Sequence, residues 1–206
     1  IGPLTVQKMA TSLPASLASL CVSGNLITGS KYSNGWTYDL DLSGLTALGE
    51  AMTSSKTLTS IDFSNCQISA KGVTVIAEFI PKIPSVVTIN CLANNFGEDG
   101  LSTLLAAIKG TSVRSLCGLT EGQTVADFSD QNLGPFDCKI MAAEFAFQGF
   151  IASIASLKLD SNGIFGELRG DGSVRNADKF VTKVQPLLDA LKTSSITSLS
   201  LRGTGM

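Results

Sequence analysis

The stretch LTSIDFSNCQI, residues 58–68, fits the pattern LxxLxLxxNxL, with Cys66 in the place of the Asn. Further copies of the pattern are LASLCVSGNLI (17–27), VVTINCLANNF (86–96), IASLKLDSNGI (154–164), ITSLSLRGTGM (196–206), a partial copy VRSLCGL (113–119) and an irregular match QTVADFSDQNL (123–133). A motif that recurs along the chain indicates repeat units, and it has to be recognised before any other fold assignment is made.

The spacing of the copies defines a short unit and a long unit. Copies that start at 58, 86 and 113 are 28 and 27 residues apart, whereas the steps from 17 to 58, 113 to 154 and 154 to 196 are 41, 41 and 42. Each copy is followed by a segment with helical spacing of apolar residues. These segments are 45–52, 72–80, 100–110, 135–147 and 177–192, and another, 4–13, precedes the first copy; the patterns at 45–52 and 4–13 are weaker than the rest. Asp99 is predicted to cap the third of them, and Pro186 to kink the last.

The motif has a direct physical reading. Leucine-type residues at its fourth and sixth positions point to the same side of a short strand, and the following helix covers them. An Asn at the bend can bind backbone groups that the bend leaves open, and stacked units would then form a ladder of such residues. Its predicted members are Asn25, Cys66, Asn94 and Asn162. One unit cannot bury its own apolar face, so the units must stack.

This pattern resembles the leucine-rich repeat family, and specifically its ribonuclease-inhibitor-like subclass. The resemblance implies an α/β solenoid, or horseshoe, with a parallel β-sheet on the concave face and α-helices on the convex face. It covers nearly the whole chain, from about Leu17 to Met206. The chain is predicted to be a single domain, 1–206, with an incomplete leading unit at 1–16 and hairpin inserts at about 28–42 and 165–176. The resemblance mostly implies protein–protein binding, and regulation of a small GTPase, known from one branch of the subclass, is the alternative.

Composition narrows the range of functions. Hydrophobic residues make up 44% of the chain and charged residues 16%, with a net charge of -2 and no histidine. Soluble domains carry roughly 25% charged residues, so this surface is bland, and it has no basic cluster for nucleic acid. The missing histidine removes Ser-His and Cys-His pairs and His metal ligands. We therefore expect no catalytic residue, no metal site and no cofactor, in a non-enzymatic interaction or scaffold module.

Cysteine spacing and the distribution of apolar residues give weaker indications of the cellular compartment and of the partners. The five cysteines are scattered and form no CxxC pair, which favours a reducing intracellular compartment over secretion. The most apolar window, 140–157, contains Glu144 and Gln148, so we do not predict a membrane span there. Ile196, Leu199 and Leu201 would line an end of the stack that needs a cap or a partner. A structural subunit of a multi-protein assembly, membrane-associated assemblies included, fits these features.

The strand face opposite the core is predicted to be small and neutral. Its first column is Ser or Thr in every copy, which either solvates the strands or lets a partner approach closely. Leu92 and Leu119 depart from this pattern and are predicted to lie exposed side by side, where they would contact a partner.

The first insert contains KYSNGWTY (31–38), which holds the sole tryptophan and both tyrosines. Asn34-Gly35 predicts a tight hairpin, and Asp171-Gly172 predicts another in the second insert, beside Arg169. Trp and Tyr are enriched at binding hot spots. Tyr32, Trp36 and Tyr38, with Arg169, are therefore candidate partner-binding residues, and the alternative is that the aromatic rings fold back over the neighbouring unit.

Overall fold

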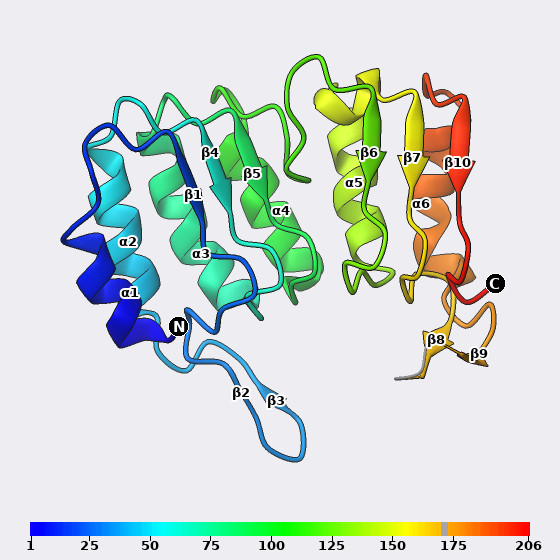
Figure 1. Cartoon of the computed structure of the whole chain (residues 1–206), viewed down its shortest axis with the longest axis horizontal. Helices are drawn as coiled ribbons and strands as arrows, with labels where there is room; N and C mark the ends of the chain where they lie inside the picture. Colours follow the sequence, from blue (N-terminus) through cyan, green and yellow to red (C-terminus); the bar gives the residue numbers. More distant parts are fainter. Residues whose placement is uncertain (170–172) are drawn as a thin grey trace. The chain divides into compact units, whose positions relative to one another are not determined.

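The structure, a computed structural model, describes residues 1–169 and 173–206, and they divide into two compact units, Ile1–Val113 and Arg114–Met206 (Figure 1). The first unit contains α1 (Pro3–Ala10), β1 (Ser19–Cys21), β2 (Lys31–Tyr32), β3 (Trp36–Thr37), α2 (Ser43–Thr53), β4 (Ser60–Asp62), α3 (Ala70–Phe79), the 3-10 helix η1 (Ile80–Lys82), β5 (Thr88–Asn90) and α4 (Gly97–Ile108). The second contains β6 (Val125–Asp127), α5 (Asp137–Ala146), the 3-10 helix η2 (Phe150–Ser153), β7 (Ser156–Lys158), β8 (Glu167–Leu168), β9 (Val174–Asn176), α6 (Val181–Leu191) and β10 (Ser198–Ser200).

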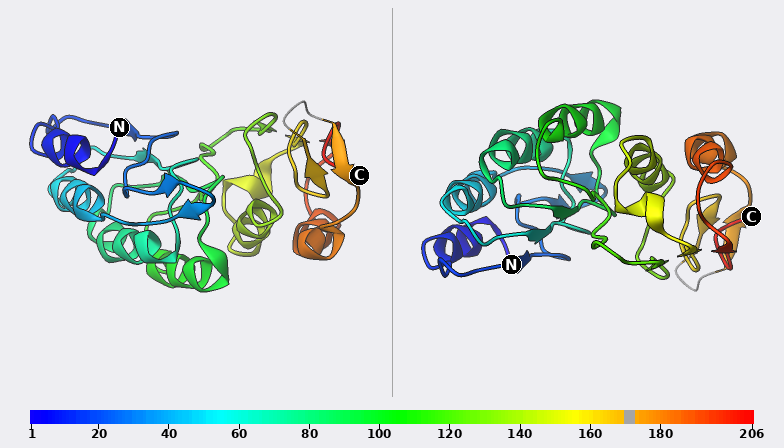
Figure 2. Two further views of the ribbon diagram at one scale, coloured as in Figure 1. Left: turned by 90° about the horizontal axis from the view of Figure 1, so that it is seen from below. Right: turned by 90° about the horizontal axis from the view of Figure 1, so that it is seen from above.

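Each unit has its own three-stranded parallel sheet, in the order β1-β4-β5 in the first and β10-β7-β6 in the second. The motif copies pair in register, because Leu20 lies opposite Ile61 and Ile61 opposite Ile89. Within each unit the helices lie on one face of the sheet (Figure 2). This arrangement of strand, bend and helix in successive copies is a leucine-rich-repeat type of fold.

Motif positions are numbered 1 to 11 below, so that Leu58 is position 1 and Ile68 position 11 of its copy. The side chains at positions 4 and 6 form most of the core between strands and helices. Buried residues at these positions are Leu20, Val22, Ile61, Phe63, Ile89, Cys91, Ala126, Phe128, Leu157 and Leu159. Phe63 also packs on Phe79 of α3, with ring centroids 6.3 Å apart. Gly49 of α2 faces the ring of Phe79, and any larger side chain at position 49 would overlap that ring.

The bends share one backbone geometry. Position 8 has a left-handed φ in six copies: Gly24, Asn65, Ala93, Asp130, Ser161 and Gly203. The neighbouring strands also share their hydrogen bonds: the position 6 amide of Phe63 donates to Asn90 at 2.9 Å and the position 8 amide of Asn65 to Leu92 at 3.0 Å. The same two bonds join β1 to β4, β6 to β7 and β7 to β10. Each junction between paired strands is therefore built from the same backbone groups.

The partial copy 113–119 was expected to form a strand of the sheet, and this is wrong, because the described chain there forms isolated bridges and no strand. Its amides are taken by side chains, since Leu116 and Cys117 donate to the Glu144 carboxylate at 2.7 and 3.1 Å. The cap prediction for Asp99 is also wrong, because α4 begins at Gly97 and Asp99 lies in its first turn. The helix that takes up part of the apolar window 140–157 is short, and none of the described helices is long and apolar enough to cross a membrane.

Candidate interaction surface

Strands β2 and β3 form the first hairpin, residues 31–37, which projects beyond the sheet and helices of its unit in Figure 1. Tyr32 lies directly opposite Trp36 across the antiparallel pair. Asn34 and Gly35 at the turn have φ of 56° and 148°, and Asn and Gly tolerate such positive values best. The local sequence therefore determines both the turn and its register.

The aromatic side chains share one face of this hairpin. Tyr32 and Trp36 are cross-strand neighbours, and Trp36 and Tyr38 lie two residues apart in extended chain, so all three point the same way. The Tyr32 and Trp36 rings meet edge to face, with centroids 5.7 Å apart, and Trp36 stacks on Tyr38 at 6.1 Å. Tyr32 is 69% exposed and Trp36 40%. The residues Tyr32, Trp36 and Tyr38 are called the aromatic face below.

The base of the first hairpin is fixed to the following repeat by buried polar groups. The Ser30 hydroxyl donates to the carbonyl of Gln67 at 2.9 Å and accepts from the Asp39 amide at 2.9 Å. Oδ2 of Asp39 accepts from the Ser69 amide at 3.1 Å and the Gly72 amide at 2.8 Å. These donors lie at the start of α3, where unpaired amides and the helix dipole favour a carboxylate. Asp39 thus caps a helix of the next repeat, which has no cap from its own Ser69 side chain.

Strands β8 and β9 form the second hairpin, in the equivalent slot of a later long unit. Glu167 pairs with Asn176, and the register shifts by one residue before Leu168 pairs with Val174. Glu167 accepts a hydrogen bond from Asn176 at 2.5 Å and pairs with the Lys179 ammonium. The contact with Lys179, followed by the one with Asn176, lowers the pKa of Glu167. This hairpin is charged where the first is aromatic, and its predicted Asp171-Gly172 turn lies outside the described residues.

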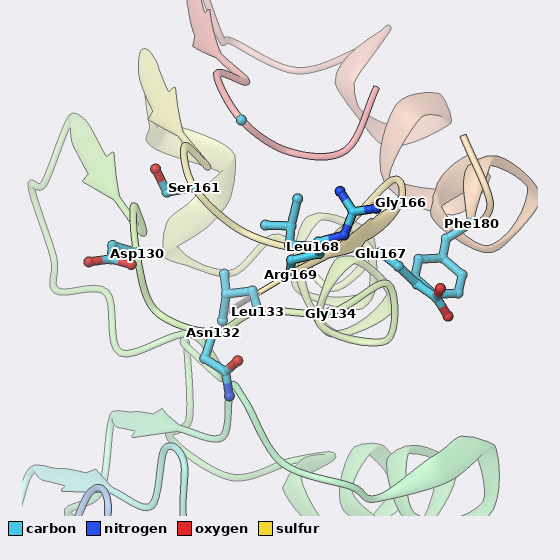
Figure 3. A pocket seen from close by; sticks show the side chains of 12 residues that line it. Asp130, Asn132, Leu133, Gly134, Ser161, Gly166, Glu167, Leu168, Arg169 and Phe180 are labelled. Carbon is cyan, nitrogen blue, oxygen red and sulfur yellow. The ribbon is translucent and has the colours of Figure 1, made fainter. Parts of the chain in front are cut away.

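A hollow of about 860 Å³ lies beside the second hairpin. Figure 3 shows it between the bends at Asp130 and Ser161 and the hairpin side chains of Leu168 and Arg169. The Arg169 guanidinium bonds within its own hairpin, to the Ser173 hydroxyl at 3.3 Å and the Val174 carbonyl at 3.5 Å. No cluster of three or more His, Cys, Asp or Glu able to hold a metal occurs in the described residues.

The position 9 side chains bind backbone from two repeats at once. Oδ1 of Asn94 accepts from the amides of Cys66 and Ile68 at 3.1 and 3.0 Å, and Nδ2 donates to the Phe63 carbonyl at 2.8 Å. Asn162 makes the corresponding bonds to Gln131, Leu133 and Phe128. This pattern ties each bend to the one before it.

Cys66 and Asn25, the position 9 residues of the first two copies, make only some of these hydrogen bonds. The Cys66 thiol donates to the Val22 carbonyl at 3.1 Å, and burial raises the pKa of this thiol to about 11, so it stays protonated. Asn25 donates to the carbonyls of Val22 and Ser23 at 3.1 and 3.0 Å and accepts from the amino group of Ile1.

The open face of the second sheet carries paired charges. Lys158 lies 3.0 Å from the Asp127 carboxylate, and a hydrogen bond from Ser129, followed by the one from Lys158, lowers the pKa of Asp127 to about 2. Asp160 accepts from the Ser200 hydroxyl at 2.9 Å and the Arg202 amide at 2.8 Å. These charged groups are paired within the chain, so this face presents little net electrostatic potential to a partner.

The predicted partner-binding residues are divided between the two units. The three residues of the aromatic face come together in the first unit, and Arg169 belongs to the second. Leu92 and Leu119 are only 1% and 2% exposed, so the prediction that they lie exposed is wrong. Leu92 lies beyond the end of β5, where strand alternation no longer sets its direction, and Leu119 lies in the segment that Glu144 and Ser115 hold in turns. Neither is available to a partner.

The roles of two buried polar residues were not predicted: Asp39 at the base of the first hairpin and Glu144 in the second unit. Asp39 looks like an ordinary loop residue in the sequence, because its contacts lie 30 and 33 residues away. Its one signal is its place two residues after the hairpin, and Asp178 occupies the same place after the second hairpin. Glu144 is fully buried, and burial raises its pKa. Its carboxylate accepts hydrogen bonds from Leu116, Cys117, Ser115 and Ile151. No local sequence pattern around Glu144 predicts these contacts.

No protein-family model matches the chain, and no curated protein matches its sequence. Among solved structures, it is similar to the tropomodulin C-terminal domain from Caenorhabditis elegans, with a TM-score of 0.44, 14% identity, and 92% of this chain and 93% of that one covered. It is also similar to TLR13, solved in a complex with ssRNA13, with a TM-score of 0.38 and 15% identity. That match covers 91% of this chain and 19% of the TLR13 chain.

Proposed function

We propose that this chain is a non-enzymatic protein-interaction module, in which the aromatic face of the first hairpin binds a protein partner. The observation that carries the proposal is the exposure of Tyr32 and Trp36 on one face of a projecting hairpin. If the rings served to cover the neighbouring repeat, they would be buried against it. Large exposed aromatic groups are the side chains most enriched in binding hot spots.

Rigidity supports the same function. A two-stranded hairpin is marginal by itself, but Ser30 and Asp39 fix both of its ends to the following repeat. The three rings also restrain one another by edge-to-face and stacked contacts. A surface that is ordered before binding loses less conformational entropy when a partner docks, so more of the contact energy appears as affinity. The aromatic face has that property.

The finer assignments belong to this proposal as well. Short units of 28 residues with a full helix, and Asn or Cys at position 9, support the ribonuclease-inhibitor-like subclass. Low charge and an apolar composition support a role as a structural or accessory subunit of a larger intracellular assembly. No observation on the structure favours regulation of a small GTPase.

The test compares two hairpins of the same chain. Trp36→Ala removes the central ring of the aromatic face, and Val174→Ala is the matched control, since Val174 is an exposed apolar residue on the second hairpin. Proteins captured from the native source by the unaltered chain are compared with those captured by each variant. The partner should be retained by Val174→Ala and bound at least about tenfold more weakly by Trp36→Ala.

Each variant is also followed by thermal unfolding. An unchanged melting temperature for Trp36→Ala together with lost binding supports contact by the aromatic face. Equal capture by all three chains, with a lowered melting temperature for Trp36→Ala, would show that the ring serves folding and would refute the proposal.

A further inference from the structure

The three rings of the aromatic face carry polar groups that the chain leaves free. The hydroxyls of Tyr32 and Tyr38 and the indole N–H of Trp36 have no hydrogen-bond partner in the part of the chain that the structure describes. These groups are left to water or to a partner. The indole N–H can only donate a hydrogen bond, and each hydroxyl can donate one as well. A partner of this face must therefore bring hydrogen-bond acceptors.

The aromatic face itself carries no charge, and few charges lie near it in the chain. Residues 28–42 contain one cation, Lys31, and two carboxylates, Asp39 and Asp41. Alternation along β2 points Lys31 to the face of the hairpin opposite the rings. Asp39 is buried, and Asp41 accepts from the Ser43 amide at 2.9 Å. The complementary ligand is therefore uncharged, which excludes a single-stranded nucleic acid, because its phosphates need a positively charged groove beside the stacking rings.

The hairpin also restricts the backbone conformation of a peptide partner. β2 and β3 are two residues long each, so their outer edges are too short to pair with an added strand. In a helical partner the backbone carbonyls are bonded within the helix and cannot serve the rings. A polyproline II segment has no internal hydrogen bonds, so its backbone carbonyls remain free. This conformation supplies the acceptors that the aromatic face requires.

The size of the aromatic face fits one turn of a polyproline II helix. Trp36 lies at a corner of the face, with the Tyr32 ring across the hairpin at 5.7 Å and the Tyr38 ring along the chain at 6.1 Å, between centroids. A polyproline II helix places every third residue on one side, about 9 Å apart. Each ring spacing is shorter than this turn, and the two together exceed it. Two prolines of a Pro-x-x-Pro segment can therefore rest on the two tyrosine rings, with the indole between them.

We propose that the aromatic face binds a proline-rich segment of its partner in the polyproline II conformation, an inference that rests on the proposed function. The aromatic rings pack on proline rings, which carry no charge and no backbone N–H. The indole N–H and the tyrosine hydroxyls donate to the carbonyls of the segment. Ser30 and Asp39 fix the base of the hairpin, and proline restricts the segment, so both surfaces are ordered before they meet.

The test measures binding of fluorescein-labelled decaproline to the full chain by fluorescence anisotropy. Saturable binding with a Kd below about 1 mM is expected, whereas a flexible Gly-Ser peptide of the same length should not bind. Trp36→Ala should weaken the binding at least about tenfold, and Val174→Ala on the second hairpin should leave it unchanged. Tyr32→Phe and Tyr38→Phe keep the ring and remove a donor, so each should weaken the binding about threefold or more.

Competition with the captured partner separates this inference from the proposed function. Decaproline should displace a partner whose capture requires Trp36. A partner that requires Trp36 but is not displaced would overturn the proline-rich ligand and leave the proposed function in place. Decaproline binding that survives Trp36→Ala also overturns the inference, as does binding of cellohexaose in the absence of decaproline binding. Thermal unfolding shows that each variant is folded, and the two Tyr→Phe variants carry the comparison if Trp36→Ala is not.

Discussion

The two hairpins occupy the same slot of a long repeat but have different surroundings. The strand β2 begins four residues after position 11 of its copy and β8 three residues after, and an Asp with a left-handed φ lies two residues after each hairpin. The first has an uncharged turn and an aromatic face, and its Asp39 is buried against the next repeat. The second is held by the pair of Glu167 with Lys179, and its Asp178 is exposed. The position within the repeat therefore determines where a hairpin forms. The residues of the hairpin and the repeat that follows it determine what its surface can bind.

The largest expected effect tests what the two units share. Asn94→Ala and Asn162→Ala each remove a buried amide that bonds to five backbone groups. Each should lower the free energy of unfolding by about 3 kcal/mol, because several buried polar groups lose their partner. Urea denaturation measures it. Asn95→Ala, at an exposed neighbouring position, is the control and should cost less than about 0.5 kcal/mol.

Similar losses at Asn94 and Asn162 would sharpen the comparison, since the two units would then be built on equivalent bends. A loss at one site alone would break it.

The next effect tests where the hairpins differ. Asp39→Ala should lower the free energy of unfolding by about 2 kcal/mol, because it removes a buried carboxylate that caps α3. Asp178→Ala should have no measurable effect on the same quantity. Chemical denaturation of the two variants beside the unaltered chain gives both values. Equal losses would mean that Asp39 does not act through the following repeat.

The smallest effect is a pH dependence confined to the second hairpin. The folded-state pKa of Glu167 is lowered, so the contribution of this group is present above its ordinary pKa of about 4.3 and is lost as pH falls through the lowered value. Amide exchange of β8 and β9 should therefore quicken on acidification. The first hairpin, KYSNGWT, contains no acidic side chain and should not respond at β2 and β3. Exchange that quickens equally in both would contradict this assignment.

The sequence was sufficient for the parts of the fold that depend on local periodicity. Leucine-type residues at positions 4 and 6 identified the strands, because alternate side chains of a strand share one face. Asn34-Gly35 located the first turn, because few residue pairs tolerate two successive positive φ values. Both inferences use residues close together in the chain, and each is independent of how the units pack.

The remaining features depend on contacts between distant residues. The segment 113–119 matches the motif, yet Glu144 takes the amides that a strand would use. Leu92 has the right spacing for the open face, but it is buried just past the end of β5. The roles of Asp39 and Ser30 depend on groups in the following repeat. Periodicity gives the position of a residue in a unit, whereas burial and capping depend on its neighbours in space.

The proposed function requires an exposed aromatic face that a protein partner covers. Trp36 is the sole tryptophan, so its fluorescence reports on that face directly. When the partner is added, acrylamide quenching of Trp36 should fall several-fold and the emission should shift to the blue, because the ring leaves water. A partner that binds with full affinity while the quenching of Trp36 stays unchanged would contradict the account.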